Sequence, residues 1–451
     1  MPSSHPHALL RRTAAALTLA SALLLSARLT AQKGPPPLSA QDRKAAVEQI
    51  GKLLAESYVF PDVAQKAGAA IAAKEKEGAY GKLDDSFAFA DALTADLQAV
   101  THDKHMRVGV HPPRPPQPPG SAPAAPREPD PAELDRELRA ENYGFREVKL
   151  LPGNIGYLRL DGFVPANLGG RTAVAAMGFL GGADAIIFDL RQNGGGSPTM
   201  IQLLSSFLFK EPTHLNDLYW RQGDRRDQFW TLAWTPGETR PEVPVYVLTS
   251  ARTFSAAEEF TNNLKVLKRA TIVGETTGGG ANPGEGFDVG DRFVIFVPTG
   301  RAINPTTGTN WEGTGVEPDV KTAAKDALLA AQAAALDALA AKAKEPEAAA
   351  RLRFARLLVE GQLHPYAPPA SHLGDYAGAY GPRRVTLENG ALFYQREGRP
   401  RLGMIPVAED VFALEGNEDF LARFERDASG RVVKFVGIYA GGNTDENPRT
   451  P

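Results

Sequence analysis

Apolar residues recur at intervals of three and four over residues 43–100, which is the spacing of one helix face. Residues 154–320 differ, because short apolar runs such as ADAIIFDL and VPVYVL alternate with helix-like segments, and GFDVG and DRFVIFVP read as further short strands. A continuous apolar run of this kind is typical of a strand buried on both faces. The alternation predicts an α/β layer with a largely parallel sheet.

The C-terminal part has a different pattern. Residues 321–361 are alanine-rich and helical in character, whereas short strands between ENG and ASG turns follow from about residue 372. These changes predict a small β domain that is separate from the α/β layer. The expected organisation is a helical module (40–110), an α/β domain (131–320), a helical connector (321–365) and a β domain (372–445).

Residues 111–130 form a proline-rich segment that contains too few apolar residues to offset the entropy of ordering. We expect an exposed, semi-rigid linker here. Only about 40 residues separate Val110 from Gly153, which is fewer than the ~50–250 residues of a typical domain. No further complete domain is expected between the helical module and the α/β domain.

The N-terminus carries the pattern of an export signal. Arg11 and Arg12 precede TAAALTLASALLL, an apolar run near the length of a signal-peptide core and too short to span a bilayer. A small residue, Ala31, ends a plausible cleavage site. The pattern predicts a signal peptide over residues 1–31, export to a bacterial periplasm or beyond, and no stable membrane span after its removal. A buried N-terminal helix is the alternative.

Composition narrows the possible chemistry. The net charge of −3 gives no electrostatic footprint for nucleic acid. The 451 residues include no cysteine, which excludes disulfides, thiolate metal sites and a cysteine nucleophile. His102 and His105 are spaced i, i+3, but no HExxH pattern accompanies them, so no metal site is expected.

Ser255 follows a buried-looking strand and opens a helical pattern with Ser-Ala-Ala-Glu. Ser255 and Glu258 fit a capping box, in which the serine hydroxyl serves the backbone of the first turn. The alternative is a nucleophile at a helix tip, because Ala256 and Ala257 are small and the amides of a helix start favour a developing negative charge.

Asn193-Gly194-Gly195-Gly196 lies in an equivalent place, after one buried strand and before a helix. Neither phosphate-binding glycine motif is present. The glycines form either a tight turn or a set of backbone donors close to a ligand.

The strings IIFDLRQNGGG, VYVLTSARTFSAAEEF, IVGETTGG and GTGVEPDV, in this order, resemble the C-terminal-processing peptidases, a serine peptidase family that includes tricorn protease and the repeats of interphotoreceptor retinoid-binding protein. The resemblance covers about residues 40–320. YVFPD and the Asp103-x-His105 pattern are most similar to the retinoid-binding-protein-like branch. The resemblance implies a ClpP/crotonase-like α/β catalytic core, here without a PDZ domain.

Matched residue by residue, the resemblance implies that Ser255 is the nucleophile. It implies that the backbone N–H groups of Ala256 and Gly195, or else Gly194, form the oxyanion hole. Many members use a lysine just after a GE-x-T stretch as the base, but that position is Gly280 here. A serine–lysine dyad is therefore not expected.

In the tricorn-like branch a histidine and a glutamate take this role, and they match His105 and Glu312. Lys104 stands where tricorn-like sites have a hydroxyl residue. The preferred hypothesis is an exported serine peptidase that cleaves peptides or proteins through an acyl-enzyme, with no metal or organic cofactor. The alternatives are a non-catalytic binder of hydrophobic ligands on the same fold, and an esterase that uses the same serine.

Overall fold

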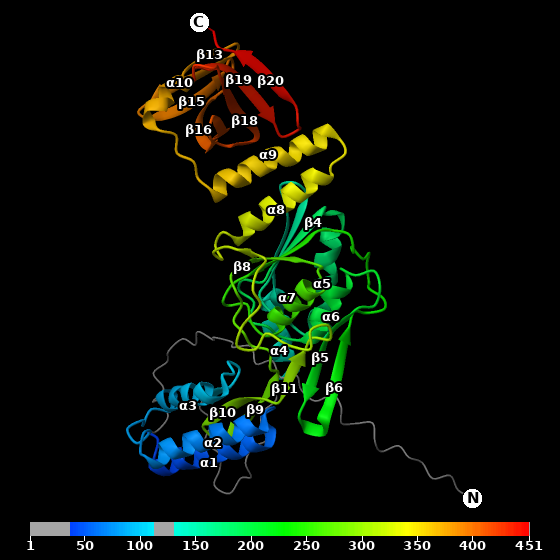
Figure 1. Ribbon diagram of the computed structural model, residues 1–451, viewed down its shortest axis with the longest axis vertical. Helices are drawn as coiled ribbons and strands as arrows, with labels where there is room; N and C mark the ends of the chain where they lie inside the picture. The colour runs from blue at the N-terminus through cyan, green and yellow to red at the C-terminus, as the bar shows by residue number, and fades with distance from the viewer. Residues whose placement is uncertain (1–36, 112–129, 451) are drawn as a thin grey trace, which may run out of the picture.

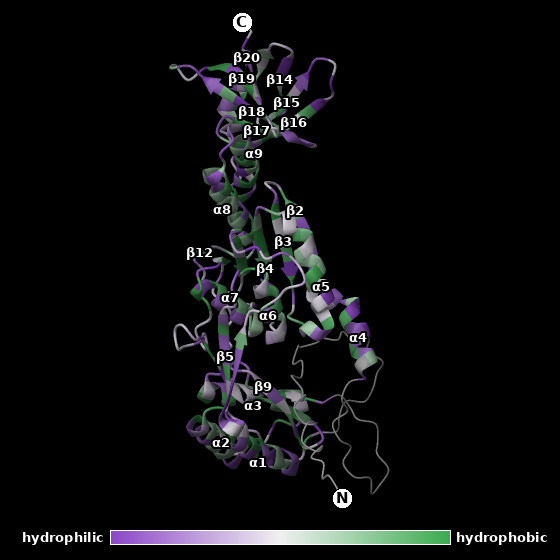
Figure 2. Ribbon diagram, turned by 90° about the vertical axis from the view of Figure 1, so that its right-hand side faces the viewer, coloured by the Kyte–Doolittle hydropathy of each residue, from purple (hydrophilic) through white to green (hydrophobic). Residues whose placement is uncertain are grey.

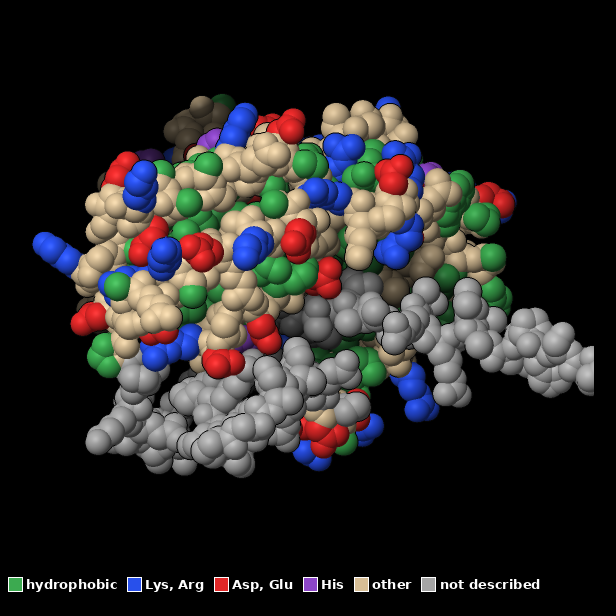
Figure 3. Space-filling view, turned by 90° about the horizontal axis from the view of Figure 1, so that it is seen from below, with side chains coloured by type: hydrophobic (Ala, Val, Ile, Leu, Met, Phe, Trp, Pro, Cys, Tyr) green, Lys and Arg blue, Asp and Glu red, His purple; other side chains and the backbone are tan. Residues whose placement is uncertain are grey.

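The computed structural model describes residues 37–111 and 130–450. The predicted signal peptide and nearly all of the proline-rich linker lie outside these residues. The described part is elongated, with the N-terminal helices at one end, the α/β core in the middle and a β domain at the other end (Figure 1). On the face seen in Figure 3, acidic and basic side chains are intermixed.

The N-terminal module consists of three helices packed on a small antiparallel sheet. β1 pairs with β10, and β10 pairs with β9, so residues 284–298 complete a module that begins at residue 40. The sequence pattern assigned these strands to the α/β layer instead. β9 and β10 instead belong to the N-terminal module because their apolar side chains pack on its helices. The rings of Phe89 and Phe293, for example, pack edge to face with 5.6 Å between their centroids. The elements are α1 (Ala40–Ser57), α2 (Pro61–Lys76), α3 (Ser86–Thr101), β1 (Arg107–Val110), β9 (Gly284–Val289) and β10 (Phe293–Pro298).

The core is a six-stranded sheet in the order β12-β8-β7-β4-β3-β2. β3, β4, β7, β8 and β12 run parallel, and β2 is antiparallel to β3. The side chains of β4 and β7 are buried along their whole length, as the continuous apolar runs predict. The strands are β2 (Phe145–Leu151), β3 (Ile155–Leu160), β4 (Ala185–Asp189), β7 (Val245–Thr249), β8 (Thr271–Gly274) and β12 (Val320–Lys321).

Helices cover both faces of this sheet, so the predicted mixed α/β class is confirmed. One face packs against α5 (Ala166–Phe179), α6 (Pro198–Ser206) and α7 (Ala256–Val266). The other face packs against α8 (Ala327–Lys342), whose alanines contact β4 and β7. Figure 2 shows hydrophobic positions along the central strands and α8. Within the described ranges, no helix has both the length and the apolar character needed to cross a bilayer.

A second, three-stranded antiparallel sheet lies between the core and the N-terminal module (Figure 1). Its order is β11-β5-β6, and β11 leads into the loop that carries Glu312. A short helix, α4, precedes β2. The bounds are α4 (Pro131–Ala140), β5 (His214–Trp220), β6 (Arg225–Trp230) and β11 (Gly300–Ile303).

The C-terminal domain is an eight-stranded antiparallel meander in chain order. Tyr380 and Arg449 form an isolated bridge that brings the first strand against the chain just after the last one. α9 (Pro346–Leu363) packs against α8 and against β16, and so joins this domain to the core. The elements are α10 (Leu373–Tyr376), β13 (Gly378–Tyr380), β14 (Arg383–Glu388), β15 (Ala391–Arg396), β16 (Arg401–Ala408), β17 (Val411–Leu414), β18 (Asn417–Arg426), β19 (Val432–Tyr439) and β20 (Thr444–Pro448).

Candidate active site

Ser255 lies at the turn between β7 and α7, with φ +53° and ψ −122°. A serine rarely adopts a positive φ, and such strain persists only where the surroundings impose it. Of the predicted capping box, the carboxylate half is present, because the Ser255 N–H donates to Glu258 Oε2 at 2.9 Å. The serine side chain, however, makes no cap hydrogen bond. Its hydroxyl is therefore free for another partner, on a residue that is partly exposed.

The glycine loop after β4, residues 193–196, packs against this serine. Gly195 has φ +113°, and a Cβ built on it would lie 2.7 Å from Ser255 Cβ and 3.1 Å from the Ala256 nitrogen. Only glycine allows this approach. The Gly195 N–H donates to Asn193 Oδ1 at 2.9 Å, whereas no acceptor among the described residues pairs with the Gly194 or Ala256 amides. Of the two preferred oxyanion donors, Ala256 is therefore free and Gly195 is engaged by Asn193.

His105 lies in the turn between α3 and β1, on the N-terminal module. Its backbone N–H donates to Asp103 Oδ1 at 3.0 Å, which fixes the turn. Its ring lies against Phe254, with 4.6 Å between ring centroids, and Phe254 directly precedes Ser255 in the chain. The fold thus brings a histidine from one module beside the serine loop of another. No hydrogen bond between Ser255 and His105 is present in the described part of the chain.

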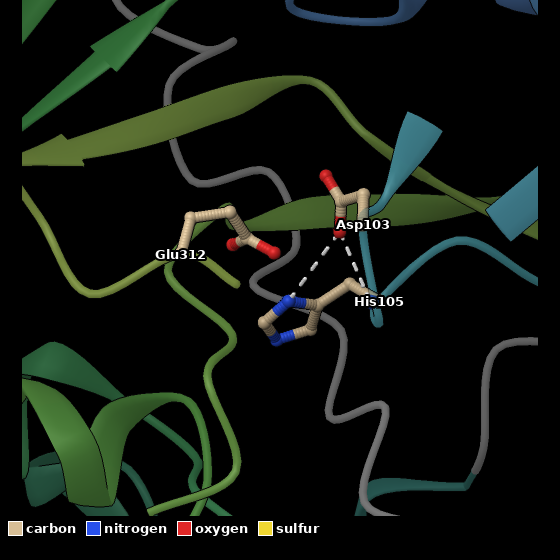
Figure 4. Close-up of side chains that lie close together, drawn as sticks. All are labelled: Asp103, His105 and Glu312. Carbon is tan, nitrogen blue, oxygen red and sulfur yellow. Dashed lines mark hydrogen bonds and ion pairs between the residues drawn. The ribbon is translucent and has the colours of Figure 1, made fainter. Parts of the chain in front are cut away.

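The imidazole is nearly enclosed, with 12% of its side chain exposed. Burial lowers the pKa of His105 to about 4, so the ring is neutral at pH 7, which is the form that a general base needs. Nδ1 is buried without a hydrogen-bond partner, and it lies 3.9 Å from Asp103 Oδ1. Figure 4 shows Nδ1 on the side of the two carboxylates and the other ring nitrogen directed away from them.

Glu312 reaches the same place from the loop after β11. The Ala281 N–H donates to its Oε2 at 2.5 Å, and its Oε1 is buried without a partner. Burial, and then the charge of Asp103, raise the pKa of Glu312 to about 7. One nitrogen or oxygen atom from each of the side chains of Asp103, His105 and Glu312 lies within 4.8 Å of the other two. The structure therefore brings together the predicted His105 and Glu312.

Asp103 is a site residue to which sequence reasoning gave no role. Its side chain is buried, and its Oδ2 accepts from Asn282 Nδ2 at 2.9 Å and from the Tyr58 hydroxyl at 3.4 Å. Burial raises the pKa of Asp103. The signal that could have found it was the Asp-x-His spacing, because an aspartate two residues earlier can accept the histidine's own N–H.

Glu258 is the second residue that was missed, since the sequence suggested only a helix cap. It is fully buried. Its Oε2 accepts from the N–H groups of Ser255 and Gly280, and its Oε1 accepts from the Thr277 hydroxyl and the Gly279 N–H. Burial raises its pKa, although these four hydrogen bonds act in the opposite direction. Glu258 thereby ties the serine turn to the loop 277–280.

Gly280, the lysine position of the serine–lysine branch, faces the histidine. A Cβ at this position would lie 2.2 Å from Phe254 Cζ and 2.7 Å from His105 Cε1. Any side chain at position 280 would therefore require Phe254 and His105 to move from their present positions. The Lys104 side chain does not bond to His105, because its Nζ donates to the Gly278 carbonyl at 2.5 Å.

Residues 154–322 match the model of peptidase family S41, and residues 40–140 match the model described as the N-terminal domain of Peptidase_S41 in eukaryotic IRBP. The chain belongs to peptidase family S41. This S41 peptidase is accordingly a serine hydrolase, and its family implies peptide or protein substrates.

Solved structures similar to this S41 peptidase include a putative peptidase from Parabacteroides merdae, at 20% identity and TM-score 0.43, over 63% of this chain and 90% of that one. The photosystem II D1 C-terminal processing protease matches at 17% identity and TM-score 0.37, over 63% and 94%. The tricorn protease matches at 13% identity and TM-score 0.40, over 64% of this chain and 35% of that one.

Proposed function

We propose that this S41 peptidase cleaves peptide bonds through an acyl-enzyme on Ser255, with His105 as general base. The observation that carries the proposal is the geometry of the serine turn. A strained Ser255 keeps its hydroxyl out of the helix cap, lies against Gly195, and is followed by a free Ala256 amide. The neutral imidazole of His105 packs on the preceding residue, Phe254.

In the first step the Ser255 Oγ attacks the peptide carbonyl carbon, and the His105 nitrogen that faces away from the carboxylates takes the hydroxyl proton. The resulting imidazolium carries its other proton on Nδ1, opposite the carboxyl groups of Glu312 and Asp103. Its positive charge favours the ionised form of these groups, whose negative charge in turn stabilises it. The imidazolium then protonates the leaving amine, and an ester on Ser255 remains. Water attacks this ester with the same histidine as base, which releases the acid and restores the serine.

The oxyanion of the tetrahedral intermediate needs donors close to Ser255. The Ala256 N–H is free, and the Gly195 N–H is adjacent but bound to Asn193 Oδ1. A fully charged oxyanion is a stronger acceptor than a neutral amide oxygen, so the Gly195 N–H is expected to turn from Asn193 to the intermediate. The serine–histidine hydrogen bond is likewise expected to form with substrate bound, because such bonds often tighten only in the complex.

We also propose that the protein is exported. The support is the sequence pattern alone: paired arginines, a short apolar run and a small residue at position 31. Expression with the native N-terminus should yield a periplasmic or extracellular protein that begins after residue 31, as read by cell fractionation and intact mass. A full-length protein in the cytoplasmic fraction would contradict this.

A fluorophosphonate probe tests the nucleophile. Wild type should be labelled, and Ser255→Ala should lose the label while it keeps its circular dichroism spectrum. Ser250→Ala is a matched control on the same turn, because the Ser250 hydroxyl is already committed to the Arg191 carbonyl at 2.6 Å. Undiminished labelling of Ser255→Ala would refute the assignment. A panel of peptides and acyl esters then separates a peptidase from an esterase, and a protein that only binds ligands would show no labelling at all.

A further inference from the structure

The cluster of Asp103, His105 and Glu312 is incomplete in its hydrogen bonds. His105 Nδ1 and Glu312 Oε1 are both buried and both lack a partner. Burying an unpaired polar atom costs free energy, so each such atom in a native protein calls for an explanation. Both residues belong, with Asp103, to a cluster in which one possible metal-ligand atom from each side chain lies within 4.8 Å of the other two (Figure 4).

The cluster also lacks a positive charge. In residues 37–111 and 130–450, neither Asp103 nor Glu312 forms an ion pair with a lysine or arginine, and the adjacent Lys104 ammonium is bound to the Gly278 carbonyl. The groups that do bind these carboxylates are neutral: the Tyr58 hydroxyl, the Asn282 amide and backbone N–H groups. Buried carboxylates are usually paired with a cation or coordinate a metal.

We propose that Asp103, His105 and Glu312 bind one zinc ion, and that this ion reversibly inhibits the peptidase. Zinc is bound in proteins by imidazole nitrogens and carboxylate oxygens, and sites with three protein ligands keep water in the fourth position. Zinc–ligand distances of about 2.0–2.2 Å place tetrahedral ligand atoms about 3.5 Å apart. The candidate ligand atoms here lie within 4.8 Å of one another, so zinc binding needs the three side chains to close by about 1 Å. Mg²⁺ and Ca²⁺ prefer oxygen ligands alone and should bind poorly.

The inhibition rests on the proposed role of His105 as base. Zinc on Nδ1 takes the lone pair that faces the carboxylates, and the neutral ring then carries its proton on the other nitrogen. That nitrogen can no longer accept the proton of Ser255, so attack on the carbonyl stops. Removing zinc restores the base without any covalent change.

Isothermal titration of zinc chloride into the full-length Ser255→Ala variant tests binding without catalysis. We expect one zinc per chain, at least a 100-fold loss of affinity in Ser255→Ala/His105→Ala, and at least a 10-fold loss on adding Glu312→Gln. His214→Asn is the matched control, since His214 Nε2 also lies beside a buried aspartate, 2.6 Å from Asp217 Oδ1. Cobalt should give the visible absorption of a tetrahedral site. Equal zinc affinity with and without His105, in variants of unchanged thermal unfolding, would overturn the proposal.

The wild-type protein is used to test whether zinc inhibits the reaction of Ser255. Micromolar zinc should suppress fluorophosphonate labelling at least 10-fold, and EDTA should restore it. Stoichiometric zinc binding through His105 in a wild type that is never labelled would leave the site standing and refute the proposed serine chemistry. Strong labelling that zinc does not change would refute the inhibitory site and leave that chemistry intact.

Discussion

Glu312→Gln should make the protein more stable than wild type at alkaline pH. In wild type, burial and the nearby charge of Asp103 raise the pKa of Glu312 to about 7 from an ordinary 4.5. At ~1.4 kcal/mol per pH unit, this difference corresponds to about 3 kcal/mol. Glutamine keeps the shape and can still accept the Ala281 N–H through its oxygen, but it carries no proton that titrates.

The direction of this pH effect on the free energy of unfolding follows from proton linkage. Below pH 4.5 the carboxyl group is protonated in both the folded and the unfolded chain, so it adds no pH dependence. Between pH 4.5 and about 7 the unfolded chain has released the proton while the folded chain still holds it, and the free energy of unfolding of wild type falls. The loss is complete about one pH unit above this folded-state pKa. The variant does not suffer this loss, so its advantage should grow by up to about 3 kcal/mol between pH 4.5 and pH 8.

Urea unfolding at pH 4.5, 6 and 8 measures this difference, with Ser255→Ala as the common background to prevent self-cleavage. Glu317→Gln is the control, because Glu317 is an exposed glutamate whose side chain is 70% accessible. An advantage of Glu312→Gln that does not change with pH would refute the reasoning, as would an equal pH dependence in the Glu317→Gln control.

The other predictions concern the serine turn and the C-terminal domain. Gly195→Ala should reduce fluorophosphonate labelling by on the order of 10²-fold, because its Cβ would displace Ser255; wild-type labelling would contradict this. Glu258→Gln should lower the free energy of unfolding by about 2–4 kcal/mol in urea titrations and reduce labelling, because an amide nitrogen would face a backbone N–H. Unchanged values for both would refute the role of Glu258 in holding the serine turn against the loop 277–280. Arg383→Ala should destabilise the C-terminal domain by about 3 kcal/mol in differential scanning calorimetry, since buried Arg383 pairs with Asp445, and should leave labelling intact; loss of labelling would contradict a separate role for that domain.

The apolar pattern of the sequence was sufficient to predict the central sheet and its helices, because strands such as β4 are buried on both faces and have continuous apolar runs. It was insufficient to predict the sheet to which β9 and β10 belong. A strand pattern states that a segment will pair, but not with which partner, and here the partner is β1, almost 200 residues earlier in the chain. The N-terminal module therefore depends on a hairpin that the sequence order assigns elsewhere.

The same limit applies to the site. Family resemblance pointed to Ser255, His105 and Glu312, and the fold brings the last two together. Spacing could not reveal that Glu258 accepts four hydrogen bonds, because three of its donors lie in the loop 277–280, some 20 residues away. The Ser-x-x-Glu pattern fits a helix cap in any helix, and only the tertiary contacts show that the carboxylate serves the loop while the hydroxyl stays free.

Glu258 and Gly280 together give a physical reason for the choice of base. Glu258 holds the Gly280 N–H at 2.8 Å, which fixes that residue against Phe254 and His105. In this position even a methyl group would overlap the imidazole, so the space beside the serine turn admits a side chain from the N-terminal module or one from position 280, but not both. Since position 280 is glycine, this space is left to His105 of the module, the base of the proposed mechanism. In the proposed mechanism, docking of α3 and β1 against the core is therefore a condition for activity, and not only for stability.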